Sequence, residues 1–162
     1  MKKKKLQKTN AIRMLDSAGV DYHVHEYSWS EGHLDAKSAA EKAGMPLGKI
    51  YKTLVTLGEK TGVTVACIPV ANELDLKALA KESGNKKIEM LPMKDLEKTT
   101  GYLRGGCSPI GMKKSFPTYI AAPAEVMEKI VVSAGKRGMQ IEISPSDLVN
   151  ITDASYADIC MG

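Results

Sequence analysis

Two β-rich runs in close succession constrain the fold more than any other feature of this sequence. The run IYKTLVTL at 50–57 and the run GVTVACIPV at 62–70 are separated only by the turn segment GEKT. Runs of this composition that are joined by a short turn pair as an antiparallel hairpin. Near the end of the chain, KIVVSA and GMQIEI are joined in the same way across the glycine-bounded segment GKRG. The sequence therefore predicts two hairpins.

Helices are predicted around these hairpins from the spacing of apolar residues. Over residues 11–18 apolar side chains recur at i, i+3, i+4 and i+7, after a cap at Thr9 or Asn10 and before Gly19, which is typical of a helix that packs by one face. Further helices are predicted at 34–46, 74–83, 92–99, as a turn at 125–129, and from a cap at Ser144 onward. Further strands are predicted at 21–27, 86–91 and 117–122.

Strands and helices thus follow one another without the regular strand–helix–strand unit of a doubly wound sheet. We predict an α+β fold, with a mixed, mostly antiparallel sheet that curls into a barrel-like core and helices at its periphery. No internal repeat, low-complexity segment or linker divides the 162 residues. A single domain over residues 1–162 is expected, with residues 1–5 as a basic N-terminal tail.

The composition argues against several classes of protein. No apolar run approaches the roughly 20 residues that cross a bilayer. The opening MKKKKLQKTN resembles the start of a signal peptide, but Arg13 and Asp16 interrupt the apolar segment that export would require. Three cysteines without a CxxC pair argue against a disulfide framework or a zinc ribbon. We therefore expect a cytoplasmic protein without a membrane partner.

Lys52 is the first candidate functional residue. The period of two in IYKTLVTL places Lys52 on the same strand face as Ile50 and Leu54. A lysine on such a face either extends its ammonium past the apolar side chains to solvent or holds a carbonyl, carboxylate or phosphate group in a cleft. The strand pattern alone leaves both interpretations open.

The loop GYLRGGCSPIG at 101–111 is the second candidate site. Its four glycines and Pro109 favour positive φ angles and a close approach of backbone N–H groups to a ligand, for example to a developing oxyanion. The loop matches neither the phosphate-binding pattern GxxxxGK[ST] nor the dinucleotide-binding pattern GxGxxG. Ser108 is a poor hydrolase nucleophile, because the residue two positions after it is Ile110 rather than glycine.

Cys107 and the histidines complete the set of reactive side chains. A nucleophilic Cys107 would need a base near it in space, and the three histidines, His23, His25 and His33, are far from it in the sequence. His23 and His25 share a strand face but have no clear third and fourth ligands. No metal and no other cofactor is therefore expected.

Four segments together carry a resemblance to a known family. They are YKTLV at 51–55, LDLKALAKESGNKKIEM at 74–90, TTGYLRGGCSPIGMKK at 99–114 and VSAGKRGMQIEISPSDL at 132–148. In order and spacing they closely resemble the YbaK-type Cys-tRNA(Pro)/Cys-tRNA(Cys) deacylases, over nearly the whole chain. The chain resembles the alanine-specific editing relatives less, because these carry a His-Pro segment where this chain has GKRG.

The resemblance implies a fold like the inserted editing domain of prolyl-tRNA synthetase. It also implies a trans-editing activity, the hydrolysis of the ester that joins cysteine to the terminal ribose of proline tRNA. A synthetase pocket separates near-isosteric amino acids by only about 1–3 kcal/mol, so a second hydrolytic site is needed. The implied partners are proline tRNA charged with cysteine and prolyl-tRNA synthetase, and no DNA partner is expected. The net charge of +4 is modest but compatible with a polyanionic partner.

The resemblance also assigns site residues. It implies an essential lysine at Lys52 and a backbone contribution from Gly105 and Gly106. The pocket neighbours that it implies are Tyr27, Thr53 and Ser133. One departure is visible, because a close relative has an aspartate where this chain has Gln140. The segment 28–37 aligns only loosely, and no residue is assigned from it.

The nucleophile and the activity itself have alternatives. The resemblance suggests that the thiol of the substrate cysteine attacks its own carbonyl, in which case Cys107 only fills space in the loop. A thiol hydrolase would instead depend on Cys107. A non-catalytic module that binds aminoacyl-tRNA or a synthetase would keep the same basic surface. A deacylase for another small amino acid, such as alanine, is a further alternative.

Overall fold

The computed structural model describes residues 8–27, 44 and 46–161. The basic tail at 1–5, the segment 28–37 and nearly all of the predicted helix at 34–46 lie outside the described residues. The α-helices are α1 (Asn10–Ala18), α3 (Leu76–Ser83), α4 (Leu96–Thr100) and α5 (Pro145–Thr152). The strands are β1 (His23–Glu26), β2 (Tyr51–Gly58), β3 (Gly62–Pro69), β4 (Glu73–Leu74), β5 (Ile88–Met90), β6 (Thr118–Ala121), β7 (Ile130–Lys136), β8 (Met139–Ile143), β9 (Ser155–Ala157) and β10 (Cys160–Met161).

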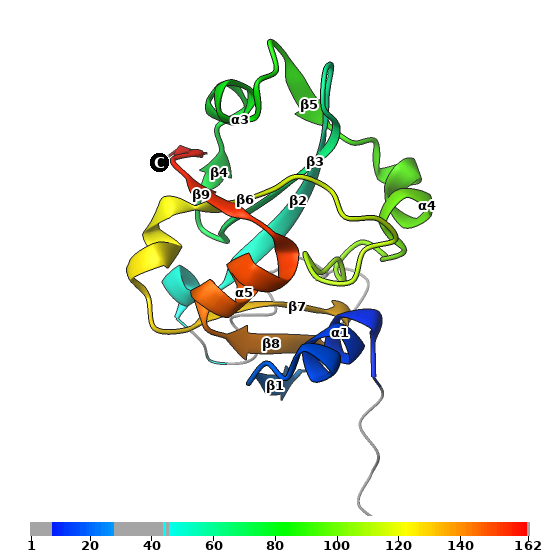
Figure 1. Cartoon of the computed structure of the whole chain (residues 1–162), viewed down its shortest axis with the longest axis vertical. Helices are drawn as coiled ribbons and strands as arrows, with labels where there is room; N and C mark the ends of the chain where they lie inside the picture. Colours follow the sequence, from blue (N-terminus) through cyan, green and yellow to red (C-terminus); the bar gives the residue numbers. More distant parts are fainter. Residues whose placement is uncertain (1–7, 28–43, 45, 162) are drawn as a thin grey trace, which may run out of the picture.

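These strands form one large and two smaller sheets (Figure 1). The large sheet has the order β5-β2-β3-β6-β9, antiparallel from β5 to β3 and parallel from β3 to β9. A three-stranded antiparallel sheet has the order β1-β8-β7, and β10 pairs with β4. The predicted α+β class with a mixed, mostly antiparallel sheet is confirmed. The described strands do not close into a barrel; the two larger sheets meet at an isolated bridge between Ile50 and Val131.

Both predicted hairpins are present, and they differ in regularity. In the hairpin of β2 and β3 the register runs unbroken from Tyr51 opposite Pro69 to Gly58 opposite Gly62. In the hairpin of β7 and β8 the register shifts between Ser133 and Lys136. A bulge of this kind adds a residue to one strand and turns neighbouring side chains in a new direction.

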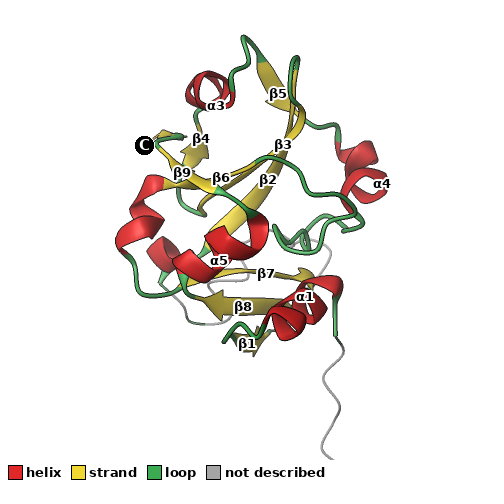
Figure 2. Ribbon diagram, in the orientation of Figure 1, coloured by secondary structure: helices red, strands yellow, loops and turns green. Residues whose placement is uncertain are grey.

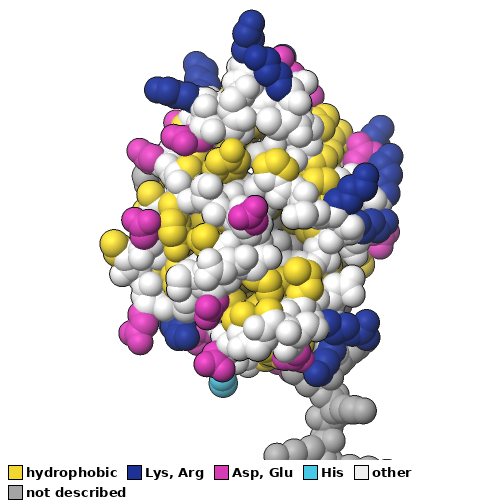
Figure 3. Space-filling view, viewed as in Figure 1, with side chains coloured by type: hydrophobic (Ala, Val, Ile, Leu, Met, Phe, Trp, Pro, Cys, Tyr) yellow, Lys and Arg dark blue, Asp and Glu magenta, His cyan; other side chains and the backbone are white. Residues whose placement is uncertain are grey.

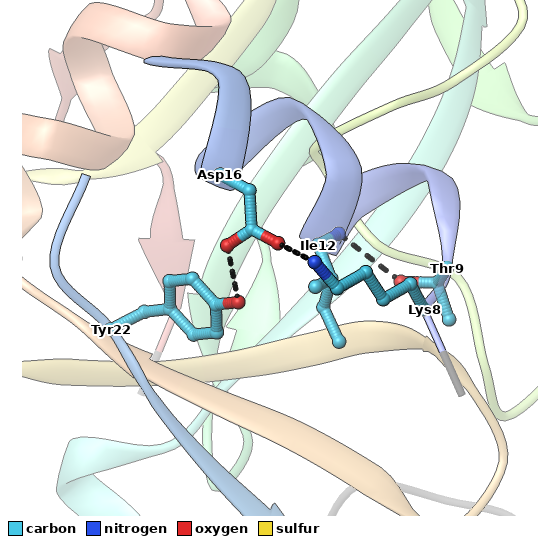
Figure 4. A network of polar contacts seen from close by, with 5 residues as sticks. All are labelled: Lys8, Thr9, Ile12, Asp16 and Tyr22. Atoms are coloured by element: carbon cyan, nitrogen blue, oxygen red, sulfur yellow. Dashed lines mark hydrogen bonds and ion pairs between the residues drawn. The ribbon is translucent and has the colours of Figure 1, made fainter. Parts of the chain in front are cut away.

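The first helix makes polar contacts at both of its ends, and one of them reaches the three-stranded sheet. The Oγ1 of Thr9 accepts a hydrogen bond from the Ile12 N–H at 3.2 Å and donates one to the Ala134 carbonyl at 2.5 Å. At the other end Asp16 accepts hydrogen bonds from the Tyr22 hydroxyl at 2.6 Å and from the Lys8 ammonium at 2.7 Å (Figure 4). The predicted helix over 11–18 is confirmed, with Thr9 as its cap.

Other predicted helices differ from the structure at their ends. The helix α3 begins after Asp75, whose carboxylate accepts from the Ala78 N–H at 3.0 Å, while the preceding Glu73 and Leu74 form β4. The helix predicted at 92–99 begins as a 3-10 turn, Met93–Asp95, before α4. The helical turn predicted at 125–129 is a 3-10 helix at Ala122–Val126.

The last part of the chain adds two strands that the sequence did not predict. β9 joins the edge of the large sheet and β10 pairs with β4 (Figure 2). Strands of two or three residues are too short to show a period of two, so sequence patterns do not detect them. Among the described residues, no helix is long and apolar enough to cross a membrane.

Candidate functional site

A cavity of about 250 Å³ lies where the large sheet, the three-stranded sheet and the loop 101–111 meet. The strand β5 pairs with β2 only at Thr56 to Gly58, and β7 contacts the strand start at Ile50. Between these two points the edge of β2 is not covered by another strand of the described chain. The cavity occupies this opening and is lined by residues 51–55 of β2.

The backbone of Thr53 faces this opening. The Ile50 carbonyl accepts a hydrogen bond from the Val70 N–H at 3.0 Å, so Ile50 and every second residue after it direct their backbone groups toward β3. The intervening residues direct theirs to the opposite edge, where the Val55 carbonyl accepts from the Leu91 N–H at 3.0 Å. Within the described residues no strand pairs with this edge at Thr53. Its N–H and C=O are therefore directed toward the cavity.

Lys52 lines the same cavity and is half-buried. Its partner across the hairpin is Ile68, which is fully buried, so the predicted apolar surroundings of Lys52 are present. The ammonium nitrogen lies 3.5 Å from the Val70 carbonyl oxygen, which is at the long limit of a hydrogen bond. Because an ammonium has three N–H donors, Lys52 keeps donor capacity for a ligand.

The two adjacent glycines of the loop, Gly105 and Gly106, have different surroundings. Gly105, at a φ of 83°, lines the cavity. The N–H of Gly106 donates to the Leu103 carbonyl at 2.9 Å, and a Cβ on Gly106 would lie 2.9 Å from the Arg137 backbone nitrogen. Gly106 thus packs against the turn between β7 and β8. Only Gly105 of the pair is in a position to direct its amide at a ligand in the cavity.

Tyr27 and Ser133 also line the cavity, from the three-stranded sheet side. The Tyr27 N–H donates to the Gly138 carbonyl at 2.9 Å, and burial raises the pKa of its hydroxyl. The Ser133 hydroxyl oxygen accepts from the Gly135 N–H at 3.2 Å within the bulge. The structure therefore brings together five of the six expected site residues: Lys52, Thr53, Tyr27, Gly105 and Ser133.

Cys107 lines the cavity as well, but its thiol is not activated. Burial raises the pKa of Cys107 to about 12, against a small opposing effect of a hydrogen bond with Thr100. At neutral pH the group is therefore a thiol, and the thiolate is the nucleophilic form. Ser108 is fully buried and its hydroxyl oxygen accepts from the Ile110 N–H at 3.2 Å, so it serves the turn.

The two described histidines lie on β1 and are not among the residues that line the cavity, although His25 is the cross-strand partner of Gln140. His25 Nε2 lies 2.9 Å from Glu142 Oε1, and Glu142 also forms an ion pair with Lys49. Lys49 and His25 together lower the pKa of the Glu142 carboxyl. His33 lies outside the described residues. In the part of the chain that the structure describes, no three His, Cys, Asp or Glu side chains converge to hold a metal ion.

Several cavity residues were not assigned from the sequence. An apolar wall extends from the last residue of β5 to the first residue of α4, with Met90, Leu91, Met93 and Leu96. Arg104 lines the loop side, and Gln140 lies on β8. Gln140 occupies one of the two polar positions in the alternation of MQIEI, so the pattern alone does not distinguish it from Glu142. The apolar wall likewise gives no signal until the chain is folded.

The charged side chains in the described lining of the cavity are all cationic. Its described lining includes the cationic residues Lys52 and Arg104 and no Asp or Glu. Figure 3 shows further Lys and Arg side chains gathered along the edge of the molecule that carries α4 and the start of α1. A cavity of this kind suits a carbonyl or an anionic group that is attached to a polyanionic chain.

Comparisons with known proteins agree on one family. Residues 31–151 match the family model described as the aminoacyl-tRNA editing domain. A protein of Enterococcus faecalis (strain ATCC 700802 / V583), named "Putative Cys-tRNA(Pro)/Cys-tRNA(Cys) deacylase EbsC", is 60% identical over 158 residues, which cover 98% of this chain and 96% of that protein.

Solved structures show the same fold. One, described as "a putative trans-editing enzyme for prolyl tRNA synthetase", superposes with a TM-score of 0.82 at 25% identity, over 94% of this chain and 96% of its own. A second, described as hypothetical protein APE2540, has a TM-score of 0.84 at 21% identity, over 94% of this chain and 100% of its own. This second likeness concerns the fold alone.

Proposed function

The chain belongs to the aminoacyl-tRNA editing domain family, and on this premise we propose that it is a trans-acting deacylase that removes cysteine from Cys-tRNA(Pro). The name of the relative that is 60% identical supports this substrate. We extend the proposal to Cys-tRNA(Cys), because the cysteinyl ester that enters the cavity is the same on both tRNAs. Such an enzyme acts where translation takes place, and we therefore place it in the cytoplasm.

One observation carries the proposed mechanism: Lys52 and Gly105 both line the cavity, and its described lining contains no activated protein nucleophile. Lys52 would bind the ester carbonyl or the ribose end of the tRNA through its ammonium group. The Gly105 amide would donate to the oxygen that becomes negatively charged in the tetrahedral intermediate. The backbone of Thr53 at the open edge of β2 would hold the aminoacyl group against these donors.

The nucleophile in this proposal is the thiol of the substrate cysteine. Its sulfur attacks the carbonyl carbon of the same residue, the bond from this carbon to the ribose oxygen breaks, and the thiol proton ends on that oxygen. The products are tRNA with a free terminal ribose and a cysteine thiolactone, which water then opens to cysteine. The raised pKa of Cys107 supports this route, since a protonated protein thiol is a poor competitor.

Selectivity would follow from the same chemistry. A small cavity does not by itself distinguish cysteine from alanine or proline by more than about 1–3 kcal/mol. A requirement for the substrate thiol adds a chemical criterion, because alanine and proline have no side chain that can form the thiolactone. Recognition of the tRNA would come from phosphate contacts of the basic edge and from prolyl-tRNA synthetase as a partner.

A single-turnover assay tests this function. Proline tRNA charged with cysteine, alanine or proline is mixed with excess protein, and loss of each ester is followed over time. We expect deacylation of the cysteinyl ester at least about tenfold faster than that of the others, because only it supplies a nucleophile. Equal rates with alanine would instead identify an alanine deacylase, and no hydrolysis of any ester would identify a binding module.

A further inference from the structure

The side chain of Gln140 presents an unusual combination of burial and missing contacts. Only 3% of the residue is exposed, and its Oε1 is buried without a hydrogen-bond partner among the residues that the structure describes. The same side chain lines the cavity. A buried carbonyl oxygen that accepts no hydrogen bond opposes folding, because it gives up its contacts with water and receives nothing in return. The position therefore calls for a reason other than stability.

The fold explains why Gln140 faces the cavity. Along β8 the alternate residues Met139 and Ile141 are buried in the main core, so Gln140 faces the other side of the strand. Its partners across the two neighbouring strands are Ser133 and His25. Ser133 and His25 have contacts of their own, with the Gly135 N–H and with Glu142 respectively. Neither of these side chains supplies a donor to Gln140 Oε1.

The missing donor is of a kind that a cysteinyl ester supplies. Two cations and no carboxylate are present in the described lining, so the α-amino group of the substrate finds no acidic partner there. That group needs an acceptor, and a side-chain amide oxygen serves this purpose. The substrate thiol is a much weaker donor than an amine N–H. It would therefore compensate less for the buried carbonyl.

We propose that Gln140 is a substrate-binding residue whose Oε1 accepts a hydrogen bond from the α-amino group of the aminoacyl ester. This inference rests on the proposed function of the site. The contact fixes one substituent of the α-carbon, and Lys52 and Gly105 fix the ester carbonyl. With both fixed, the Cα–Cβ bond of the cysteine has a defined direction in the cavity, and the sulfur reaches the carbonyl carbon by rotation about that bond alone.

Binding of stable analogues tests the contact directly. The probes are 3′-amide-linked aminoacyl adenosines in which the acyl group is cysteinyl, 3-mercaptopropionyl, which lacks the amine, or alanyl, which lacks the thiol. For the wild-type protein we expect the cysteinyl probe to bind about fivefold to tenfold more tightly than the 3-mercaptopropionyl probe, the factor of one neutral hydrogen bond. In Gln140→Leu this ratio should fall to about one, while the ratio of cysteinyl to alanyl stays as in the wild type.

Two further variants complete the experiment. Gln140→Glu keeps an acceptor at the position and should keep the preference for the amine. Glu142→Gln, two residues further along the same strand face and outside the cavity lining, should leave all ratios unchanged. A Gln140→Leu protein that still prefers the amine overturns the inference, and so does one that loses the preference for the thiol instead. If the wild type fails to hydrolyse Cys-tRNA(Pro), the proposed function fails, whatever the analogue ratios are.

Discussion

The two hairpins of this protein contribute to the same cavity in different ways. The hairpin of β2 and β3 is regular over its full register and contributes an open backbone edge together with Lys52. The hairpin of β7 and β8 is interrupted by a bulge between Ser133 and Lys136 and contributes the side chains of Ser133 and Gln140. The regular hairpin thus positions the proposed catalytic lysine, and the irregular hairpin contributes side chains to the wall of the cavity. Changes in the two hairpins should therefore affect different properties of the protein.

The largest effect is expected from the regular hairpin. Lys52→Ala should lower single-turnover deacylation of Cys-tRNA(Pro) by about a hundredfold or more, because a donor to the reacting ester is lost. Its unfolding transition should stay close to that of the wild type, since a half-buried lysine with one long contact adds little stability. Lys60→Ala, in the exposed turn of the same hairpin, is the control and should keep full activity. Wild-type rates in Lys52→Ala would favour a non-catalytic binding module.

A substitution in the irregular hairpin should mainly change the free energy of unfolding. Gly135 has a φ of 96°, and a Cβ on it would lie 2.7 Å from the Tyr102 ring. Gly135→Ala should therefore reduce the free energy of unfolding by about 2–3 kcal/mol, from backbone strain and the clash together. Gly62, in the turn of the regular hairpin, has a φ of 72° but nothing within 4 Å of an added Cβ. Gly62→Ala should cost only about 1 kcal/mol in urea unfolding, and equal losses would contradict the difference between the hairpins.

The sequence predicted those parts of the site that depend on local patterns. The alternation in IYKTLVTL located Lys52 on its strand face, and turn residues located both hairpins, because these patterns are local. The opening beside Thr53 was not predictable in this way, since it depends on where β5 stops pairing and where β7 begins to contact β2. The separation of Gly105 from Gly106 also needed the fold. The sequence does not distinguish two adjacent glycines. The fold does, because the turn at Arg137 packs against Gly106.

A smaller effect is expected at Glu142, which shares a face of β8 with Gln140 but does not line the cavity. Lys49 and His25 lower the pKa of the Glu142 carboxyl below its ordinary value of 4.5. A lowered folded-state pKa means that the ion pairs stabilise the protein fully above pH 4.5, and that this contribution is lost as the pH falls through the lowered value. Glu142→Gln should cost about 0.5–1 kcal/mol of unfolding free energy at pH 7. The difference from wild type should shrink at lower pH, and a constant difference would argue against the ion pairs.

The smallest effect is expected at Cys107, in the loop between the two hairpins. The residue lines the cavity, but burial keeps its thiol protonated, with a pKa raised to about 12. Removing the sulfur should therefore leave the chemistry to the substrate thiol, and Cys107→Ala should keep single-turnover deacylation of Cys-tRNA(Pro) within about threefold of wild type. The wild-type protein should in contrast hydrolyse the same tRNA poorly when it carries serine or S-methylcysteine. An inactive Cys107→Ala protein, together with a covalent acyl-enzyme detected by mass spectrometry in the wild type, would make the loop cysteine the nucleophile.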